Sequence, residues 1–489
     1  MNSSMIRVIL GYVLKIEACL LMLPCIVALI YGEENGWMYL LVAAICMVIG
    51  LMMTMIRKPQ NTAIYLKEGC VATASSWIVL SLFGALPFWL TGEIPSYLDA
   101  LFETVSGFTT TGASILPQVE NISKCSLFWR SFTHWIGGMG VLVFLLAIIP
   151  MSGGSNINLM KAESPGPSVG KLVPKIKSSA RILYVIYLFL TVVQIILLLC
   201  GGMSLFESVT MSFGTAGTGG FAVLNDSVAS YSVFCQWVIT IFMILFGVNF
   251  NAYYLILLKK IKKALAMEEL RWYLGIIVVS VSVISINVYN MYGNISDTVR
   301  HASFQVASIM TTTGYATTDF NLWPTTSKFI LAVLMIIGAC AGSTGGGIKV
   351  SRVAIMFKTI RRELNSYIHP KSVKKIMFDE KLVEHEVLRA INVYLITYIL
   401  VYVLSVFIIS FEGYDLTTTL TAVLATFNNI GPGLEMVGPT SNFGFFNGLS
   451  KLVMIIDMLA GRLELFPLLI LFHPKVLKDM FFGVTKRNA

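Results

Sequence analysis

The chain has 489 residues, of which 56% are hydrophobic and only 12% are charged, and its mean hydropathy is +0.78. A soluble globular protein cannot bury so much apolar surface, and the repeated apolar runs of roughly 20 residues predict a polytopic membrane protein. Because these runs are continuous rather than short and alternating, we expect an all-α architecture instead of a β-barrel.

The net charge of +9 is distributed unevenly along the chain. Lys and Arg gather in alternate loops between the apolar runs, near 57–68, 151–180, 259–271, 350–387 and 473–489, whereas the intervening loops are acidic. This asymmetry is typical of the positive-inside rule and predicts that the basic loops and both termini are cytoplasmic. It favours a lipid bilayer, and not nucleic acid, as the surroundings of the basic residues.

The first 60 residues predict a transmembrane hairpin, with spans at 8–31 and 37–56. A different unit follows: a span at 69–91, a short helix at 97–108, the segment Thr109-Thr110-Thr111-Gly112-Ala113-Ser114 and a span at 126–150. The short helix cannot cross a bilayer, so we expect it to enter the membrane and return through the Thr-Thr-Thr-Gly segment.

This unit occurs four times in the sequence. We place the four repeats at 61–170, 171–265, 266–384 and 385–489. The later copies have spans at 181–202 and 233–258, at 271–292 and 327–358, and at 388–411 and 449–472, with inserts at 204–221, 298–315 and 415–433. Such a repeat indicates four parallel pseudo-repeats of helix, pore loop and helix around a central pore.

The four polar segments predict an ion selectivity filter. Backbone carbonyls can replace the water shell of an ion, glycine permits the backbone turns that aim them at an axis, and threonine hydroxyls add oxygen ligands. The expected filter residues, which would hold the transported ion, are Thr110, Thr111, Gly112, Thr218, Gly219, Gly220, Thr312, Thr313, Gly314, Asn429, Ile430 and Gly431. One such segment alone would be read as a capped turn; four in matching positions favour a pore.

The register of the second segment has two solutions. Asp99 precedes Gly112 by the same interval as Glu207 precedes Gly220, which favours Gly220 as the equivalent glycine. A slip of one residue to Gly219 stays open. The fourth segment has Asn428-Asn429 where the first has Thr109-Thr110, so we expect looser selectivity than in a tetrameric potassium channel.

A glycine-rich stretch interrupts the second span of the third repeat. The expected gate consists of Gly342, Ser343, Thr344, Gly345, Gly346, Gly347 and Lys349. Irregular backbone at this depth is tolerated only where protein buries it or water reaches it, which predicts a hinge or gate below the filter. A phosphate-binding loop is excluded because Ile348 separates the glycines from Lys349 and no strand precedes them. Close helix packing through small residues is the alternative.

Arg462 lies well inside the last predicted span. An arginine at this depth usually faces a cavity, and in a cation pathway it would form an electrostatic barrier, so we assign it to the gate. The alternative is a structural ion pair with Asp457 or Glu464.

These motifs resemble the TrkH/TrkG family of bacterial potassium-uptake proteins, within the TrkH/KtrB/HKT superfamily. The resemblance covers nearly the whole chain. It rests on the four filter segments, Arg130-Ser131, Trp135-Ile136-Gly137-Gly138-Met139-Gly140, Glu163-Ser164-Pro165-Gly166-Pro167, Gly342–Lys349, Asn428–Gly433 and Gly461-Arg462-Leu463-Glu464. The N-terminal hairpin resembles TrkH and is lacking in KtrB.

The resemblance implies a transporter, not an enzyme, in the bacterial inner membrane. It implies potassium transport through a homodimer with one pore per protomer, filter glycines at Gly112, Gly220, Gly314 and Gly431, and Arg462 beside the gate loop. It also implies a cytosolic RCK-type ring, similar to TrkA, that binds NAD or ATP; this chain itself is expected to hold no cofactor. Two alternatives stay open: a sodium-coupled or sodium-permeable KtrB/HKT-like transporter, and an intramembrane enzyme or receptor.

Overall fold

Apolar helices build almost all of the chain, as expected where no water is present to satisfy the backbone. The computed structural model describes residues 1–56, 64–140, 176–371 and 374–481. In that part, six helices are long and apolar enough to cross a membrane, or seven if one bent pair counts as a span. The six are Ser3–Tyr31, Gly36–Met55, Leu66–Leu90, Arg181–Cys200, Glu268–Tyr292 and His385–Ser410.

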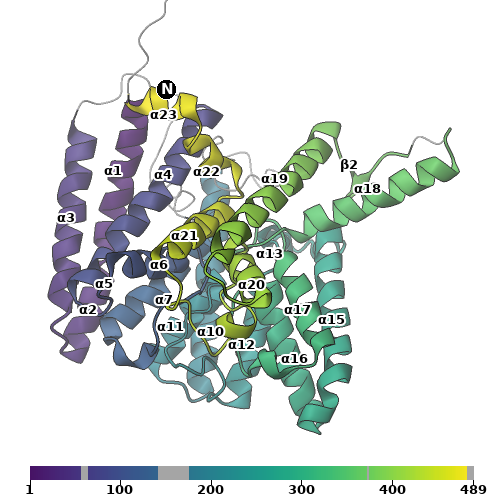
Figure 1. Ribbon diagram of the computed structural model, residues 1–489, viewed down its shortest axis with the longest axis horizontal. Coiled ribbons are helices and arrows are strands. Elements are labelled where there is room, and N and C mark those ends of the chain that lie inside the picture. The colour runs from purple at the N-terminus through teal and green to yellow at the C-terminus, as the bar shows by residue number, and fades with distance from the viewer. Residues whose placement is uncertain (57–63, 141–175, 372–373, 482–489) are drawn as a thin grey trace, which may run out of the picture.

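The N-terminal hairpin forms as predicted and lies at one edge of the molecule (Figure 1). It consists of α1 (Ser3–Leu20), α2 (Met22–Tyr31) and α3 (Gly36–Met55). Gly11 and Gly50 let the two arms approach closely, because a Cβ on Gly50 would lie 2.8 Å from the carbonyl oxygen of Gly11. Small residues commonly permit such contacts between membrane helices.

The first two repeats follow the expected order of elements. The first contains α4 (Leu66–Gly84), α5 (Leu86–Leu90), α6 (Tyr97–Phe108), η1 (Val119–Asn121) and α7 (Lys124–Gly138). The second contains α10 (Ile176–Cys200), α11 (Leu205–Gly217), α12 (Val233–Phe246), α13 (Phe250–Leu257) and α14 (Ile261–Leu265). The end of the predicted span 126–150 and the motif Glu163–Pro167 lie outside the described residues.

The last two repeats also contain a first span, a re-entrant helix and a second span that is divided into shorter helices. The third has α15 (Glu268–Tyr292), α16 (Ile295–Met310), η2 (Phe320–Leu322), α17 (Thr325–Ile336), α18 (Val350–Ile368) and a hairpin of β1 (Met377–Phe378) and β2 (Lys381–Leu382). The fourth has α19 (His385–Ser410), α20 (Leu416–Phe427), η3 (Glu435–Val437), α21 (Gly448–Arg462), α22 (Phe466–Leu471) and α23 (Pro474–Phe481).

Two predicted spans are not continuous. The span predicted at 233–258 is bent, because α12 and α13 meet at 91°. Asn249 starts α13 by accepting a hydrogen bond from the backbone N–H of Asn251 (3.0 Å), and the carbonyl of Gly247 accepts one from Cys340 (3.1 Å) instead of continuing a helix. The helix predicted at 449–472 is also interrupted, because Glu464 and Leu465 have φ of 52° and 71°.

The four repeats pack in a closed cycle. The second helix of each repeat contacts the short re-entrant helix of the next: α7 with α11, α12 with α16, α17 with α20, and α21 with α6. The last of these pairs joins the fourth repeat to the first. The all-α fold of repeated helix–pore loop–helix units is therefore confirmed, whereas the repeat boundaries at 170, 265 and 384 stay predictions.

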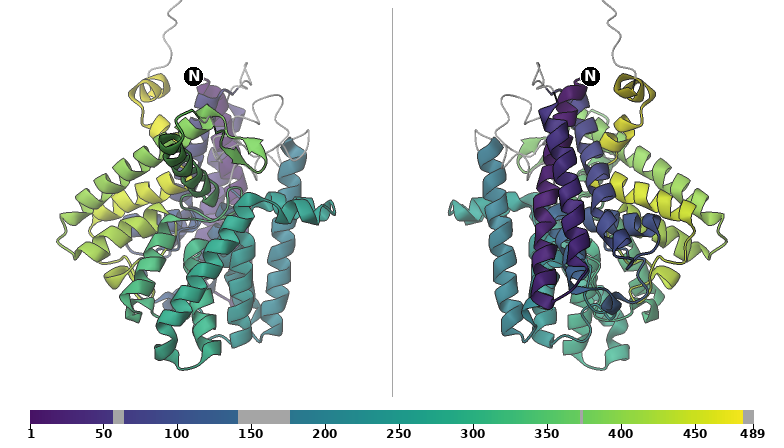
Figure 2. Two further views of the ribbon diagram at one scale, coloured as in Figure 1. Left: turned by 90° about the vertical axis from the view of Figure 1, so that its right-hand side faces the viewer. Right: turned by 90° about the vertical axis from the view of Figure 1, so that its left-hand side faces the viewer.

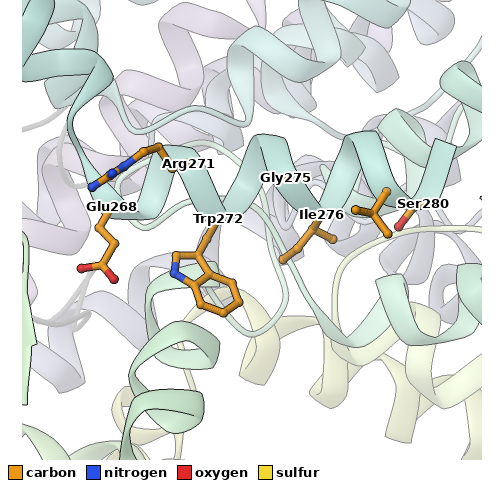
Figure 3. Close-up of a pocket in the computed structure, with 7 residues that line it drawn as sticks. Glu268, Arg271, Trp272, Gly275, Ile276 and Ser280 are labelled. Carbon is orange, nitrogen blue, oxygen red and sulfur yellow. The ribbon is translucent and has the colours of Figure 1, made fainter. Parts of the chain in front are cut away.

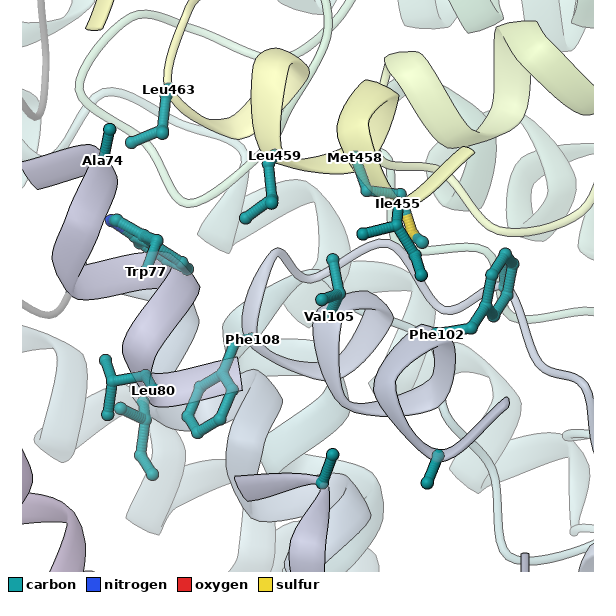
Figure 4. Close-up of a cluster of buried hydrophobic side chains, with 14 of the residues drawn as sticks. Ala74, Trp77, Leu80, Phe102, Val105, Phe108, Ile455, Met458, Leu459 and Leu463 are labelled. Atoms are coloured by element: carbon teal, nitrogen blue, oxygen red, sulfur yellow. The ribbon is translucent and has the colours of Figure 1, made fainter. Parts of the chain in front are cut away.

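The contact between the fourth and first repeats is a buried apolar cluster (Figure 4). Ile455, Met458 and Leu459 of α21 pack against Phe102 and Val105 of α6. The same cluster continues through α4 to the N-terminal hairpin. It holds α21, and therefore Arg462 at its end, in a fixed position relative to the first filter segment.

Candidate functional site

Each re-entrant helix is capped at both ends. Side chains of Ser96, Ser204, Asn294 and Asp415 accept a backbone hydrogen bond at the respective N-termini. At each C-terminus a backbone N–H reaches five residues back, from Thr111 to Ser106 (2.8 Å), Gly219 to Gly214 (2.8 Å), Thr313 to Ser308 (2.8 Å) and Ile430 to Ala425 (2.9 Å). This is the Schellman arrangement, which normally places glycine at the left-handed position.

Here threonine or asparagine occupies that left-handed position. Thr110, Thr218, Thr312 and Asn429 have φ of 56°, 55°, 59° and 56°. Two residues later a glycine is again left-handed, at Gly112 (80°), Gly220 (78°), Gly314 (84°) and Gly431 (100°). The identical pattern makes Gly220, and not Gly219, the structural equivalent of the other three glycines.

The four glycines close a ring of backbone contacts. A Cβ on Gly112 would collide with the carbonyl oxygen of Gly219, one on Gly220 with that of Thr313, and one on Gly314 with that of Ile430. A Cβ on Gly431 would lie 2.9 Å from the carbonyl oxygen of Thr111, which returns to the first segment. Only glycine permits both the left-handed turn and this close approach.

The threonine hydroxyls of the filter segments form hydrogen bonds within and between the loops. Thr109 and Thr111 hydrogen-bond to each other (2.8 Å), as do Thr311 and Thr313 (2.7 Å). The Thr111 hydroxyl also accepts from Asn429 Nδ2 (2.9 Å), which joins the first and fourth segments. These hydroxyl contacts brace the loops.

A polar cavity opens over the ring. Its volume is about 130 Å³, and its lining includes all four left-handed glycines together with Arg130 and outer-loop residues such as Asn225 and Thr440. The ring therefore communicates with one side of the protein through a small polar vestibule.

A buried ion pair stands beside this vestibule. Arg130 Nε donates to Glu103 Oε1 at 2.5 Å, and the two side chains are 3% and 0% exposed. Glu103 also accepts from the Ile115 backbone (3.0 Å), while Arg130 donates to the carbonyl of Ala222 (2.9 Å) and lies over the Phe221 ring. The pair thus fixes the exits of the first two filter segments.

His134 forms a second link between these segments. Its Nδ1 is 2.8 Å from the carbonyl oxygen of Gly107, and its Nε2 accepts from the Phe221 backbone N–H at 3.2 Å. Both contacts are satisfied only by the neutral ring with its proton on Nδ1. Sequence analysis did not assign a role to Glu103, Arg130 or His134, although a charged pair within apolar segments is the signal that could have found two of them.

The glycine-rich loop lies directly below the ring. The Gly346 N–H donates to the Thr312 hydroxyl at 2.7 Å, and a Cβ on Gly345 would lie 2.9 Å from the carbonyl oxygen of Thr311. Lys349 Nζ donates to the carbonyls of Gly345 and Gly346. The stretch from Gly338 to Lys349 is therefore a folded loop that contacts the third filter segment.

Two other contacts hold this loop from the side. Glu269, which is 3% exposed, accepts from the N–H of Ala341 (2.7 Å) and from Asn249 Nδ2 (3.1 Å). The Phe250 N–H donates to the carbonyl of Gly342 at 3.1 Å. The break between α12 and α13 is thus the docking point of the loop.

Arg462 joins the loop to the filter. One guanidinium nitrogen donates to the Thr344 carbonyl (2.8 Å) and to the Thr110 hydroxyl (3.3 Å), and the other to the carbonyls of Gly137 and Gly138. The two carboxylates considered as its partners have other contacts: Glu464 pairs with Arg352, and Asp457 accepts from Ser405 at 2.7 Å.

Comparisons with known proteins agree with this architecture. A family model described as "TrkH: Cation transport protein" matches residues 38–484. The chain is 34% identical over 481 residues to the Trk system potassium uptake protein TrkH of Escherichia coli (strain K12), covering 97% of this chain and 99% of that protein. It is 32% identical over 484 residues to the Trk system potassium uptake protein TrkG of the same strain, covering 96% and 99%. The crystal structure of the potassium transporter TrkH from Vibrio parahaemolyticus aligns with a TM-score of 0.88 at 31% identity, covering 97% of this chain and all of that one.

Proposed function

The chain belongs to the TrkH family of cation transport proteins, and on that premise we propose that it conducts potassium through the ring of four filter segments. As a member of this family it is a multi-pass membrane transporter and not an enzyme. The observation that carries the proposal is the closed cycle in which each left-handed glycine lies against a carbonyl of the next segment.

The proposed filter acts by replacing the hydration shell of the ion. In this proposal, carbonyl oxygens of 110–112, 218–220, 312–314 and 429–431 supply the ligands of the ion, and the C-terminal ends of α6, α11, α16 and α20 add partial negative charge there. Because the hydroxyls already brace the loops, selectivity depends on how rigidly the carbonyls are held.

The proposed gate is the folded loop below the filter with Arg462 as its latch. The loop fills the pathway beneath the third segment, and Arg462 places a positive charge beside it while holding Thr344 and Thr110 together. Opening requires the loop to leave Thr312 and Arg462 to exchange its carbonyl partners for water or for other groups.

We further propose that the protein works as a homodimer in the bacterial inner membrane with cytoplasmic termini. The basic loops support this orientation, and the N-terminus and α23 lie at the same end of the molecule (Figure 1). The name "Trk system" of the relatives supports a regulatory partner, for which we propose a cytosolic RCK-type ring that binds NAD or ATP.

The function is tested by rubidium flux into liposomes that contain the purified protein, with sodium as competitor. We expect rubidium uptake that exceeds sodium uptake. Gly314→Ser should lower this preference, because a Cβ there would collide with the carbonyl oxygen of Ile430. Gly293→Ser is the matched control, since Gly293 also has positive φ (63°) but open space around it. An unchanged ion preference in Gly314→Ser would contradict the filter assignment.

The proposed gate is tested by substitution of Arg462. Arg462→Ala should raise rubidium flux several-fold because the positive barrier and the bond to Thr344 are both lost. Arg462→Lys should lie between Ala and wild type, since an ammonium group cannot reproduce the fork of a guanidinium. The exposed Arg361 on α18, replaced by Ala, serves as control. Flux at or below the wild-type level in Arg462→Ala would reject the gate role.

A sodium-coupled or sodium-permeable transporter is the second candidate. The unequal fourth segment, with Asn428-Asn429-Ile430, favours it because this quarter of the ring lacks the paired hydroxyls of the first and third. Potassium uptake that requires sodium, or sodium flux comparable to rubidium flux, would support this candidate over the first.

A further inference from the structure

A groove on the outer face of α15 is separate from the ion pathway (Figure 3). Its volume is about 600 Å³, and its lining comes from one stripe of the helix: Glu268, Arg271, Trp272, Gly275, Ile276, Val279 and Ser280. Successive lining residues are separated alternately by three positions and by one, so they share one helical face. The polar residues Glu268 and Arg271 lie at one end, and apolar residues line most of the remainder.

Gly275 creates the hollow in the middle of this groove. A Cβ at Gly275 would meet no atom within 4 Å, and its φ is not positive. Neither backbone geometry nor close packing within the described residues therefore requires glycine here. Glycine in the interior of a helix lowers helix stability by about 1 kcal/mol relative to alanine. The structural consequence of having glycine at position 275 is the open floor of the groove.

The polar end of the groove contacts the end of a lysine-bearing segment, because Arg271 donates to the carbonyl of Ala266 (3.0 Å), directly after α14. The segment of α13 and α14, which leaves the bundle sideways at the end of α12 (Figure 2), carries exposed Lys259, Lys260, Lys262 and Lys263. Among the described residues none of these four forms an ion pair. Apolar side chains among and beside these lysines are also exposed: Leu257 at 65%, Ile261 at 53% and Leu265 at 60%. Such a mixture is typical of a segment that lies in a membrane interface.

We propose that this groove and these lysines bind an anionic phospholipid of the leaflet that faces the basic loops, and that the bound lipid biases the gate. The phosphate would lie among Lys262, Lys263 and Arg271, and an acyl chain would lie over Gly275 toward Val279. Glu268 does not oppose the anion, because it pairs with Lys358.

The dimensions favour a lipid over a protein as the occupant. From Glu268 to Ser280 the groove extends roughly 18 Å along the helix at 1.5 Å per residue, and one leaflet of the hydrocarbon core is about 15 Å thick. A soluble partner could reach the lysines but not Val279. A single lipid molecule provides both the anionic group and the apolar chain.

The coupling to the gate, which rests on the proposed function, passes through the first turn of α15. Glu268 faces the groove, and the adjacent Glu269 holds the gate loop by accepting from Ala341 and Ser351 (2.7 and 3.2 Å). Asn249, at the base of the lysine-bearing segment, donates to the same carboxylate. A lipid that fixes α13, α14 and the start of α15 therefore stabilises the loop in its place below the filter.

The binding experiment uses native mass spectrometry of the full chain titrated with phosphatidylglycerol or phosphatidylcholine. Wild type should retain phosphatidylglycerol preferentially. Lys262→Gln/Lys263→Gln should weaken its binding at least about tenfold, given the contribution of each basic residue near an anionic surface. Gly275→Leu should weaken it comparably by filling the groove. Lys371→Gln/Lys381→Gln, which removes two exposed positive charges elsewhere, and Ser282→Leu, which enlarges α15 beyond the groove, should bind as wild type does.

Several outcomes would overturn the lipid assignment. These are equal retention by all variants, equal retention of phosphatidylcholine, and displacement of the lipid by inorganic phosphate. A further one is a change of oligomeric state or of regulatory-ring binding in the lysine variant with lipid binding unchanged, since the lysines would then serve a protein contact.

The coupling is measured separately as rubidium flux in phosphatidylcholine liposomes with and without phosphatidylglycerol. Wild-type flux should fall when phosphatidylglycerol is present, and the lysine and Gly275→Leu variants should lose this dependence. Wild-type flux that ignores phosphatidylglycerol, or rises with it, would overturn the coupling. If no liposome shows flux, the proposed function fails, while the mass-spectrometric result still decides the lipid site.

Discussion

Three threonines of the filter hold a backbone conformation that β-branched residues avoid. Thr110, Thr218 and Thr312 are left-handed, at a cost of about 1–2 kcal/mol each, whereas Asn429 in the fourth segment adopts this conformation more readily. Strain of this kind persists where surrounding contacts over-determine the site. Thr312 is held by the N–H of Gly346 and Thr110 by Arg462. Within the described part of the chain, the Thr218 hydroxyl bonds only to the carbonyl of the adjacent Gly217 (2.6 Å).

Thr218→Asn should therefore stabilise the protein by about 1 kcal/mol, because asparagine tolerates the left-handed region better. The measurement is thermal unfolding in detergent, followed by tryptophan fluorescence. Thr312→Asn is the matched control: it relieves similar strain but loses the bond to Gly346, so it should give no net gain. Equal changes at both positions would show that the strain does not depend on local bracing.

The buried pair of Glu103 and Arg130 should be sensitive to the loss of either partner. Glu103→Gln leaves the guanidinium buried without its counter-charge and should destabilise the protein by about 3–5 kcal/mol. The double variant with Arg130→Gln should cost less than the sum of the two single variants, as measured by thermal unfolding in a double-mutant cycle. Glu435→Gln breaks the more exposed pair with Lys328 (3.4 Å) and should change stability by less than about 1 kcal/mol. Additive effects at Glu103 and Arg130 would contradict their coupling.

At the level of helices, the sequence predicted the elements that local signals define. The four short helices were identified because each is too short to cross a bilayer and is followed by glycine. The break after α12 was missed, since a single glycine in an apolar run is compatible with a helix. What fixes that break is a contact with Cys340 and Gly342, some 90 residues later in the chain, and such a partner cannot be read from local sequence.

The break after α12 gives a prediction for local dynamics. Asn249→Ala removes the cap of α13 and the bond to Glu269, a loss of about 1 kcal/mol. Amide hydrogen exchange in the gate loop around Ala341 should then accelerate about fivefold. Asn447→Ala removes a comparable cap at α21, where Asn447 accepts from Ser450 (2.9 Å), and should leave the gate loop unchanged. Unaltered exchange in Asn249→Ala would show that the loop is held independently of the break.

At the level of the whole molecule, the repeat pattern predicted four units around a pore but not how they join. The repeat pattern did not predict that each second span pairs with the next re-entrant helix. It also did not predict which hydroxyls brace the loops. The contacts that close the cycle, α21 with α6 and Asn429 with Thr111, join segments more than 300 residues apart in the chain. The register at Gly220 became clear from the backbone turns and not from residue identity.

The bond between the first and fourth repeats should matter for ion preference. Asn429→Ala removes the hydrogen bonds to the Thr111 hydroxyl and the Met458 carbonyl (both 2.9 Å), so the two segments should separate more easily. We expect a lower ratio of rubidium to sodium flux in liposomes. Asn321→Ala also removes two bonds between repeats, both to Glu435 in the outer loops, and should keep the wild-type ratio. Equal ratios in wild type and Asn429→Ala would show that the contact does not set selectivity.

The closing contact of the ring is the least crowded of its four. A Cβ at Gly431 would have 2.9 Å to the Thr111 oxygen, where the corresponding atoms at the other three glycines would collide. In a channel built from four identical chains, any change in the pore loop is imposed on every side at once. Here one polypeptide contains four separately encoded filter segments, so the sequence of one segment can change while the other three maintain the pore. The fourth segment contains the asparagines and Pro432, and its glycine has the least crowded contact. Substitutions in this segment should therefore be tolerated better than in the other three.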